Sequence, residues 1–249
     1  MNPAGRPAVR KLLSAAKRSA AGRLTMIGSV VAVRTQEPVV VLTYDDGPEP
    51  GGTDAVLEAL AEWQATATFF VLVNRARSHP GLLRSVLQGG HEIGLHGMDH
   101  RRLTSLPPAE VTARHRKGKC ELEDLTGRPV RFVRPAYGHQ TMRTWNAARI
   151  AGLETVLWDY TTWDWRGDVT TTERVEVAMQ AARPGAILLA HDGFAASADG
   201  ADEGVAPVVD RGELSRRILA GFSELGLRCS SLGGALTAGE PVRRASFVS

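Results

Sequence analysis

The sequence predicts an α/β fold, a distorted (β/α) barrel of the TIM type in a single domain. Short apolar runs alternate with longer amphipathic stretches about seven times, which is typical of parallel strands joined by crossover helices. The residues that could carry chemistry follow the carboxyl ends of these runs, where a (β/α) barrel builds its active site. With 249 residues, 43% of them hydrophobic, the chain is long enough to bury one such core.

The strands are expected where short, mostly apolar runs occur. The first is expected at 26–33, followed by a turn near Gln36-Glu37-Pro38. The others are expected at 39–44, 67–73, 92–95, 131–133, 155–158, 186–190 and 227–230.

Helices are expected between these strands, and Gly or Pro marks several of their ends. In the first helix, Val56, Leu57, Leu60 and Trp63 recur at helical spacing, and Gly89-Gly90 ends the second. The expected helices span 54–63, 80–88, 108–125, 141–150, 172–182 and 213–225. Residues 195–207 look like one long loop.

Charge is unevenly distributed along the chain. Residues 1–34 hold seven basic residues and no acidic one, whereas the remainder holds 23 basic and 27 acidic residues and nets −4. The basic character therefore belongs to the N-terminus and does not indicate a nucleic-acid groove. We expect residues 1–25 to form a basic N-terminal segment, helical or flexible, and residues 241–249 to form a C-terminal tail. Contact of the basic segment with an anionic surface is the alternative reading.

The apolar stretch from Leu24 to Val33 follows a basic region, as in a secretory signal. Cleavage near Val33 would remove the first expected strand, and no A-x-A-like site is evident. We therefore expect a cytoplasmic protein, with a secreted or cell-surface protein as the alternative. No apolar stretch approaches the roughly 18–20 residues that span a bilayer. Two cysteines, Cys120 and Cys229, exclude a disulfide framework.

Carboxylates and imidazoles gather after three of the apolar runs. Asp45 and Asp46 are adjacent, His96 and His100 stand four residues apart, and His191 ends a run. Two His and one Asp are a common ligand set for a catalytic zinc that keeps a position open for water. One Asp and one His then remain as candidate base and acid. Adjacent carboxylates cannot both point the same way, and one helical turn between the two His would let both reach one ion. Taken alone, each pair could also be a turn or a surface feature.

Three further features flank these groups. Arg134 follows an expected strand and could hold a carboxylate in bidentate geometry, or lie in a surface turn. The indoles of Trp158, Trp163 and Trp165 suit either a core or a groove that stacks on sugar rings. His139 could line the site.

Together these segments resemble the polysaccharide deacetylase family (NodB homology domain, carbohydrate esterase family 4). The similarity runs from about Val39 to Gly193, with a plausible continuation to about Ala235. The segments that match the family's TFDDGP, H-S/T-x-x-H, third, DxxDW and last motifs, in order, are Thr43–Pro48, His96–His100, Arg134–Gly138, Asp164-Trp165 and Leu189–His191. The resemblance implies a distorted (β/α) barrel at 26–240 that removes N-acetyl groups from amino sugars. It also implies a divalent metal, most often Zn²⁺, with Co²⁺, Mn²⁺ or Ni²⁺ possible.

The resemblance further implies a role for each matching residue. Asp45 would be the general base and His191 the general acid. The metal ligands would be Asp46, His96 and His100.

The remaining matches would support this chemistry. Arg134 would orient the base, and the backbone N–H of Tyr137 would help to hold the oxyanion. Asp164 would tune the catalytic His, Trp165 would wall the groove, and Leu189 would line an acetyl pocket.

Two positions depart from the family pattern. Gly97 stands where the family has Ser or Thr, which puts metal affinity in question. Thr161 stands where DxxDW has its first Asp, which puts groove shape and substrate choice in question. We expect an N-deacetylase acting on a poly- or oligosaccharide or glycoconjugate. A small-molecule amidase and a non-catalytic carbohydrate-binding protein are the alternatives. No nucleic-acid partner is expected, and the oligomeric state stays open.

Overall fold

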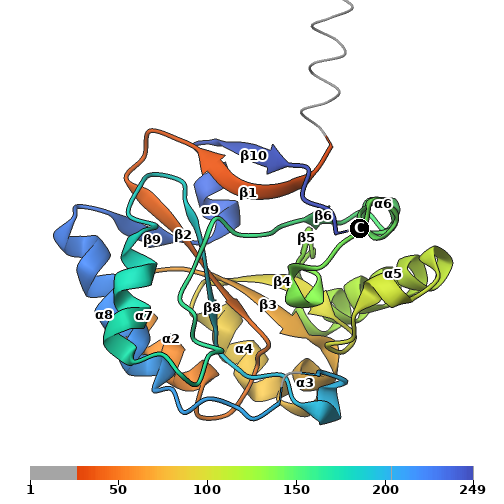
Figure 1. The fold of residues 1–249 in the computed structure, drawn as a ribbon, viewed down its shortest axis with the longest axis horizontal. Helices are drawn as coiled ribbons and strands as arrows, with labels where there is room; N and C mark the ends of the chain where they lie inside the picture. Colours follow the sequence, from red (N-terminus) through yellow and green to blue (C-terminus); the bar gives the residue numbers. More distant parts are fainter. Residues whose placement is uncertain (1–26, 203, 249) are drawn as a thin grey trace, which may run out of the picture.

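The structure, a computed structural model, describes residues 27–202 and 204–248, so the predicted basic segment 1–25 lies outside it. In these residues one sheet has the strand order β6-β5-β4-β3-β2-β8-β7, and β9 pairs with β2 as well. Every pairing in this sheet is parallel. The sheet curls into a barrel, which is open between β6 and β7 because no described pairing joins these two strands (Figure 1). The predicted distorted (β/α) barrel is confirmed.

The strands of this sheet are mostly short. They are β2 (Val39–Asp45), β3 (Thr68–Leu72), β4 (Glu92–Gly97), β5 (Phe132–Val133), β6 (Glu154–Thr155), β7 (Tyr160–Thr161), β8 (Ile187–His191) and β9 (Arg228–Ser230). The α-helices are α2 (Thr53–Glu62), α3 (Val73–Ser78), α4 (Pro80–Gln88), α5 (Pro108–Thr126), α6 (Met142–Ile150), α7 (Thr171–Met179), α8 (Arg211–Glu224) and α9 (Leu232–Leu236). Each predicted strand and helix has a counterpart among these elements or in β1, described below.

The differences from the prediction lie in short elements. The third expected strand was extended to Val73, but α3 begins there and turns the chain away from the sheet. The run 155–158 contributes only its first residue to β6. Strand β7 is two residues long, too short to give an apolar run. Within the predicted loop 195–207, a single 3₁₀ turn spans Ser197–Asp199.

A second, two-stranded sheet pairs β1 (Ser29–Arg34) with β10 (Glu240–Arg244) in antiparallel fashion. The prediction of a C-terminal tail is therefore wrong for residues 241–244. Strand β1 also spans the barrel opening, because Leu157 N–H donates to the Val30 carbonyl (2.8 Å) and Val33 N–H donates to the Gly185 carbonyl (2.7 Å). Strand β10 then supplies hydrogen bonds to β1 that an edge strand would otherwise lack. In Figure 1 this sheet crosses the top of the barrel.

The core lies between the sheet and the helices that surround it. All seven residues of β2 are buried, as expected for a central parallel strand covered on both faces. Helices α2, α7 and α8 pack on one side and α5 and α6 on the other (Figure 1). In the described residues, no helix has both the length and the apolar character that crossing a bilayer requires. This packing fixes the carboxyl ends of β2, β4 and β8, where the candidate residues lie.

Candidate metal-dependent active site

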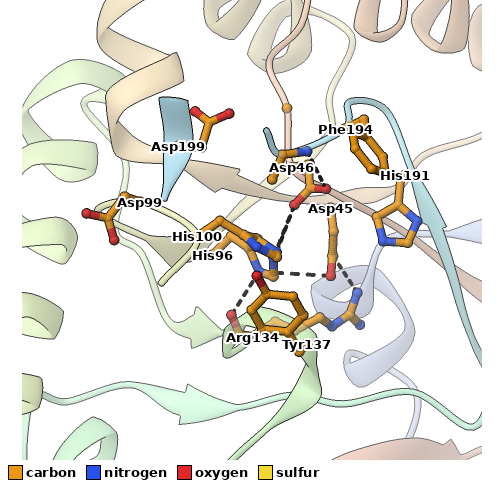
Figure 2. A network of polar contacts seen from close by, with 12 residues as sticks. Asp45, Asp46, His96, Asp99, His100, Arg134, Tyr137, His191, Phe194 and Asp199 are labelled. Carbon is orange, nitrogen blue, oxygen red and sulfur yellow. Dashed lines mark hydrogen bonds and ion pairs between the residues drawn. The ribbon is translucent and has the colours of Figure 1, made fainter. Parts of the chain in front are cut away.

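The candidate residues meet at one end of the barrel. Asp45 closes β2 and His191 closes β8, and the parallel register places these two residues side by side. His96 lies near the end of β4. All three line one cleft of about 330 Å³. Figure 2 shows their side chains converging on the same region.

Asp46, His96 and His100 form a buried cluster. The Asp46 Oδ1 atom lies 3.3 Å from His96 Nε2 and 3.4 Å from His100 Nε2. One ligand atom from each residue falls within 4.8 Å of the others. Asp46 has a φ of 78°, a left-handed conformation that is uncommon outside Gly. This turn aims Asp46 at the histidines while Asp45 points to Arg134, as expected of adjacent carboxylates (Figure 2).

The expectation that one helical turn separates His96 and His100 is wrong. His96 is in strand β4, and His100 lies in the bend that follows it. Gly97 makes this bend possible, with a φ of 154°. The His100 N–H donates to the carbonyl of Asp199 (2.8 Å), which fixes its backbone. A strand end and a bend therefore bring the rings together, with centroids 5.1 Å apart.

The protonation of the cluster fits a bound cation. His96 Nδ1 lies 2.9 Å from the Arg134 carbonyl oxygen, which can only accept, so Nδ1 carries the proton. Nε2 then faces Asp46 Oδ1 at 3.3 Å, where a second proton serves the contact: burial lowers the pKa of His96, but the charges of Asp45 and Asp46 outweigh it and raise the pKa. A divalent cation at this place would replace that proton and bind Nε2 together with the carboxylate. A backbone carbonyl on the far nitrogen is also how metal-bound His is commonly oriented.

Electrostatics support the same reading. Burial, helped by the charge of His96, lowers the pKa of His100 to about 4, so this ring is neutral at pH 7. Burial opposes ionisation of Asp46, but the hydrogen bond from His96 and the nearby imidazoles outweigh it and lower its pKa. An anionic oxygen and neutral imidazole nitrogen are what a divalent transition metal binds.

Arg134 holds Asp45 through a fully buried guanidinium. Its Nη1 donates to Asp45 Oδ1 (2.7 Å) and to Thr43 Oγ1 (2.8 Å). The other nitrogens donate to the carbonyls of Val156 (3.4 Å) and Leu157 (3.1 Å). Arg134 therefore does not bind the Asp45 carboxylate in the predicted bidentate geometry, because its other nitrogens donate to backbone carbonyls that follow β6. Arg134 therefore holds Asp45 through Oδ1, while Oδ2 lies 3.9 Å from His96 Nδ1.

His191 is paired with a buried carboxylate. Asp164 Oδ1 lies 2.7 Å from His191 Nδ1, and Asp164 Oδ2 accepts from the His191 N–H (2.8 Å). Burial lowers the pKa of His191, but the charge of Asp164 outweighs it and raises the value to about 9. The ring therefore carries a proton at neutral pH, as a general acid must. Arg211 lies against the same carboxylate, 3.3 Å from Oδ2.

Apolar and aromatic side chains wall the cleft. Leu189, Tyr137, Trp158 and Trp165 line it, and the Trp165 ring meets His191 edge-on with centroids 5.6 Å apart. Trp163 is not among the lining residues, so only two of the three indoles belong to the groove.

Two other sequence expectations resolve at the rim. His139 does not line the cleft and instead lies 2.7 Å from Arg102, whose guanidinium covers the Tyr137 ring at 4.0 Å. The Thr161 hydroxyl accepts from the Trp163 N–H (3.4 Å). The charged group beside Asp164 is the guanidinium of Arg211.

Asp192 is a site residue that sequence reasoning missed. It is fully buried, and its carboxylate accepts from Gly47 N–H (3.1 Å) and Thr53 Oγ1 (2.6 Å). A Cβ at Gly47 would lie 1.9 Å from Asp192 Oδ2, so only Gly allows this close approach. Burial raises the pKa of Asp192 to about 7. Its place directly after His191 is the only sequence signal it gives.

Comparisons with known proteins agree with this geometry. A family model described as polysaccharide deacetylase matches residues 32–156. The chain belongs to the polysaccharide deacetylase family. The peptidoglycan-N-acetylmuramic acid deacetylase PdaC of Bacillus subtilis is 34% identical over 72% of this chain, which spans 38% of that protein. The chitooligosaccharide deacetylase of Azorhizobium caulinodans is 33% identical over 68% of this chain and 81% of that protein.

A solved structure shares the fold of this polysaccharide deacetylase family member. The pseudoenzyme BA3943 of Bacillus anthracis, from carbohydrate esterase family 4, superposes with a TM-score of 0.71 at 20% identity. The match covers 83% of this chain and 68% of that one. The region matched by the family model contains Asp45, Asp46, His96, His100 and Arg134, whereas Asp164 and His191 lie beyond it. The roles of these residues stay predictions, supported here by their geometry.

Proposed function

We propose that this protein hydrolyses the N-acetyl group of an N-acetylated amino sugar within an oligosaccharide or polysaccharide. The observation that carries the proposal is the placement of Asp45 and His191 in one cleft beside the buried trio of Asp46, His96 and His100. The relatives named above are deacetylases of peptidoglycan and of chitooligosaccharides, which supports the substrate class. A cytoplasmic location stays a prediction.

Zinc is the metal that the ligand set favours. Two imidazoles and one carboxylate match catalytic zinc sites, and Co²⁺, Mn²⁺ or Ni²⁺ could take the same ligands. A divalent ion held by this trio would supply Lewis-acid activation of water and of the acetyl carbonyl.

Asp45 is suited to take the proton from the attacking water. Arg134, which also donates to Thr43, holds Asp45 by Oδ1, and Asp45 lines the cleft. The anchor holds the carboxylate in one position beside the cleft, which a general base requires. Tyr137 lines the cleft and has a left-handed φ of 60°, and its backbone N–H would help to stabilise the oxyanion.

His191 is suited to protonate the departing amine. Its Nδ1 is held by Asp164, which leaves Nε2 as the nitrogen that can give a proton to the substrate. The raised pKa keeps that proton in place at neutral pH. Leu189 offers an apolar surface for the acetyl methyl group, and Trp165 offers a ring face for the sugar.

The non-catalytic alternative has a structural precedent, because BA3943 has this fold and is a pseudoenzyme. Fold alone therefore does not establish catalysis. In this chain the ligand trio, the anchored carboxylate and the acid–carboxylate pair are all present, which favours the enzyme. The small-molecule amidase differs only in substrate size, so the same assay separates it.

The test is acetate release by zinc-reconstituted protein from chito-oligosaccharides and from small N-acetylated amino sugars. Asp45→Asn should bind zinc as the wild type does and lose activity by about 10²–10⁴-fold. Asp124→Asn, an isosteric change on the exposed face of α5, should leave the rate unchanged.

Each outcome of this assay has a defined meaning. Release from oligomers supports the proposed function, and release from small substrates alone supports the amidase. Wild-type rates in Asp45→Asn would refute the base assignment. Zinc binding without release from any substrate would refute the proposed function.

A further inference from the structure

Arg75 in α3 contacts the backbone of Asp46 and lies in none of the five segments that resemble the family motifs. Its side chain is largely buried, with 13% exposed. Nε donates to both carboxylate oxygens of Asp199 (3.2 Å each), and Nη2 donates to Asp199 Oδ2 (2.7 Å). The guanidinium thus fixes Asp199 in a forked, charge-assisted contact.

The same guanidinium reaches the loop and the first motif. Nη2 donates to the carbonyl of Phe194 (2.7 Å), and Nη1 to the carbonyl of Asp46 (3.4 Å). Nη1 also lies 3.4 Å from the carboxylate of Glu49. Arg75 therefore connects three chain segments, although it does not itself line the cleft.

The segment 194–202, here called the bracing loop, contacts two of the expected ligands directly. The Ala195 N–H donates to Asp46 Oδ2 (3.1 Å), which leaves Oδ1 to face the two imidazoles. The Asp199 carbonyl accepts from His100 N–H (2.8 Å). A third contact runs from Asp202 N–H to the hydroxyl of Tyr137 (3.0 Å).

Asp199 is the residue on which these contacts depend. Besides Arg75, its carboxylate accepts from Asn74 Nδ2 (2.7 Å) and from Ala196 N–H (3.0 Å). These donors fix the side chain, and the backbone carbonyl of the same residue fixes His100. In Figure 2 Asp199 lies apart from the ligand rings, so its influence on them passes through the backbone.

We infer that Arg75 and Asp199 are positioning residues for the metal site. Together they fix the bracing loop so that one N–H orients the Asp46 carboxylate and one carbonyl orients His100. The inference rests on the proposed metal site but not on the identity of the substrate. Loss of groups that orient metal ligands typically weakens metal binding by about 10–100-fold.

Zinc affinity of the full-length apoprotein, measured by competition with a chromogenic chelator, tests this inference. Arg75→Met and Asp199→Asn should each weaken zinc binding by about 10–100-fold. The double variant should bind zinc only slightly less tightly than the single variant of lower affinity, because both changes release the same loop. Arg75→Lys, which keeps the charge but not the fork, should fall between Arg75→Met and the wild type. Arg216→Met, which removes a surface contact to Glu62, should bind zinc as the wild type does.

Activity assays and thermal unfolding of the apoprotein separate positioning from simple stabilisation. Acetate release by Arg75→Met should recover toward the wild-type rate at saturating zinc, with an unchanged KM. Zinc affinity within twofold of the wild type in both single variants, with only a lower melting temperature, would overturn the inference. So would a raised KM at unchanged zinc affinity. Because the zinc titration needs no substrate, a wild type that binds zinc but releases no acetate refutes the proposed function alone. Asp199→Asn is nearly isosteric, so the test stands even if Arg75→Met fails to fold.

Discussion

At Gly97 the backbone takes a conformation that a side chain would disturb. Its φ is 154°, and a Cβ there would lie 2.5 Å from the carbonyl oxygen of Asp99. Here the bend is held from outside, through the Asp199–His100 contact and an ion pair between Asp99 and Arg114.

Gly97→Ser should therefore weaken zinc binding by about tenfold or more, although it restores the family residue. The added Cβ would displace the Asp99 carbonyl and, with it, His100. The chelator competition assay measures the change, and Gly81→Ser is a matched control because its side chain would meet open space. Tighter zinc binding in Gly97→Ser would show that the bend tolerates a side chain.

His191 should determine the alkaline limit of activity. A general acid works only while protonated, so kcat should fall as pH rises through about 9. Asp164→Asn removes the charge that raises this pKa, while burial still lowers it. The alkaline limb should then move to lower pH by at least about one unit, together with a lower maximal rate. A pH–rate profile at saturating zinc measures both effects. If the alkaline limb of Asp164→Asn stayed at the wild-type pH, the proposed effect of Asp164 on the pKa of His191 would be wrong.

Among the secondary-structure elements, β10 makes the clearest energetic prediction. It completes β1, and the residues around it contribute the Arg243–Glu154 ion pair and a Gln140–Ser246 hydrogen bond (2.8 Å). Deleting residues 240–249 should lower the free energy of unfolding by about 2–4 kcal/mol, because β1 loses its outer hydrogen bonds. Zinc affinity should change little, since these residues do not contact the ligand trio.

Urea denaturation with and without a chelator measures this effect. Glu240→Gln, which breaks only an exposed pair with Arg34, should change stability by less than about 0.5 kcal/mol. An unchanged denaturation midpoint after the deletion would mean that β1 is held by the barrel alone.

For the whole molecule, local pattern was enough to predict the barrel and to place the candidate residues at one end of it, whereas the choice of metal ligands among them came from the family resemblance and stays a prediction. Parallel strands covered on both faces are apolar throughout, so runs such as 39–44 and 186–190 stand out in the sequence. Asp46 and His96 lie directly at the ends of such runs. Strand β10 was missed because Glu240-Pro241-Val242-Arg243-Arg244 is polar, and its partner β1 lies some 200 residues away in the chain.

The supporting residues could not be predicted for the same reason. Arg75 acts on Asp199, which is 124 residues away, and Asp192 holds Gly47 across 145 residues. Neither lies in a segment with a recurring spacing, and an isolated Arg or Asp has no signal of its own. The helical spacing of His96 and His100 was wrong because a bend at one glycine can bring two rings together as well as a helix can.

The antiparallel pairing of β1 and β10 also sets how the molecule would respond to tension. The start of β1 lies beside the end of β10, with Ser29 opposite Arg244. Force applied through the two ends of the described chain would therefore break the hydrogen bonds of this pair one after another, rather than all at once. Under such a pull the contacts of Ser246 and Val248 with Gln140 would be loaded first, and the small sheet next. The ligand trio belongs to neither strand of this sheet, so opening the pair would break none of its contacts.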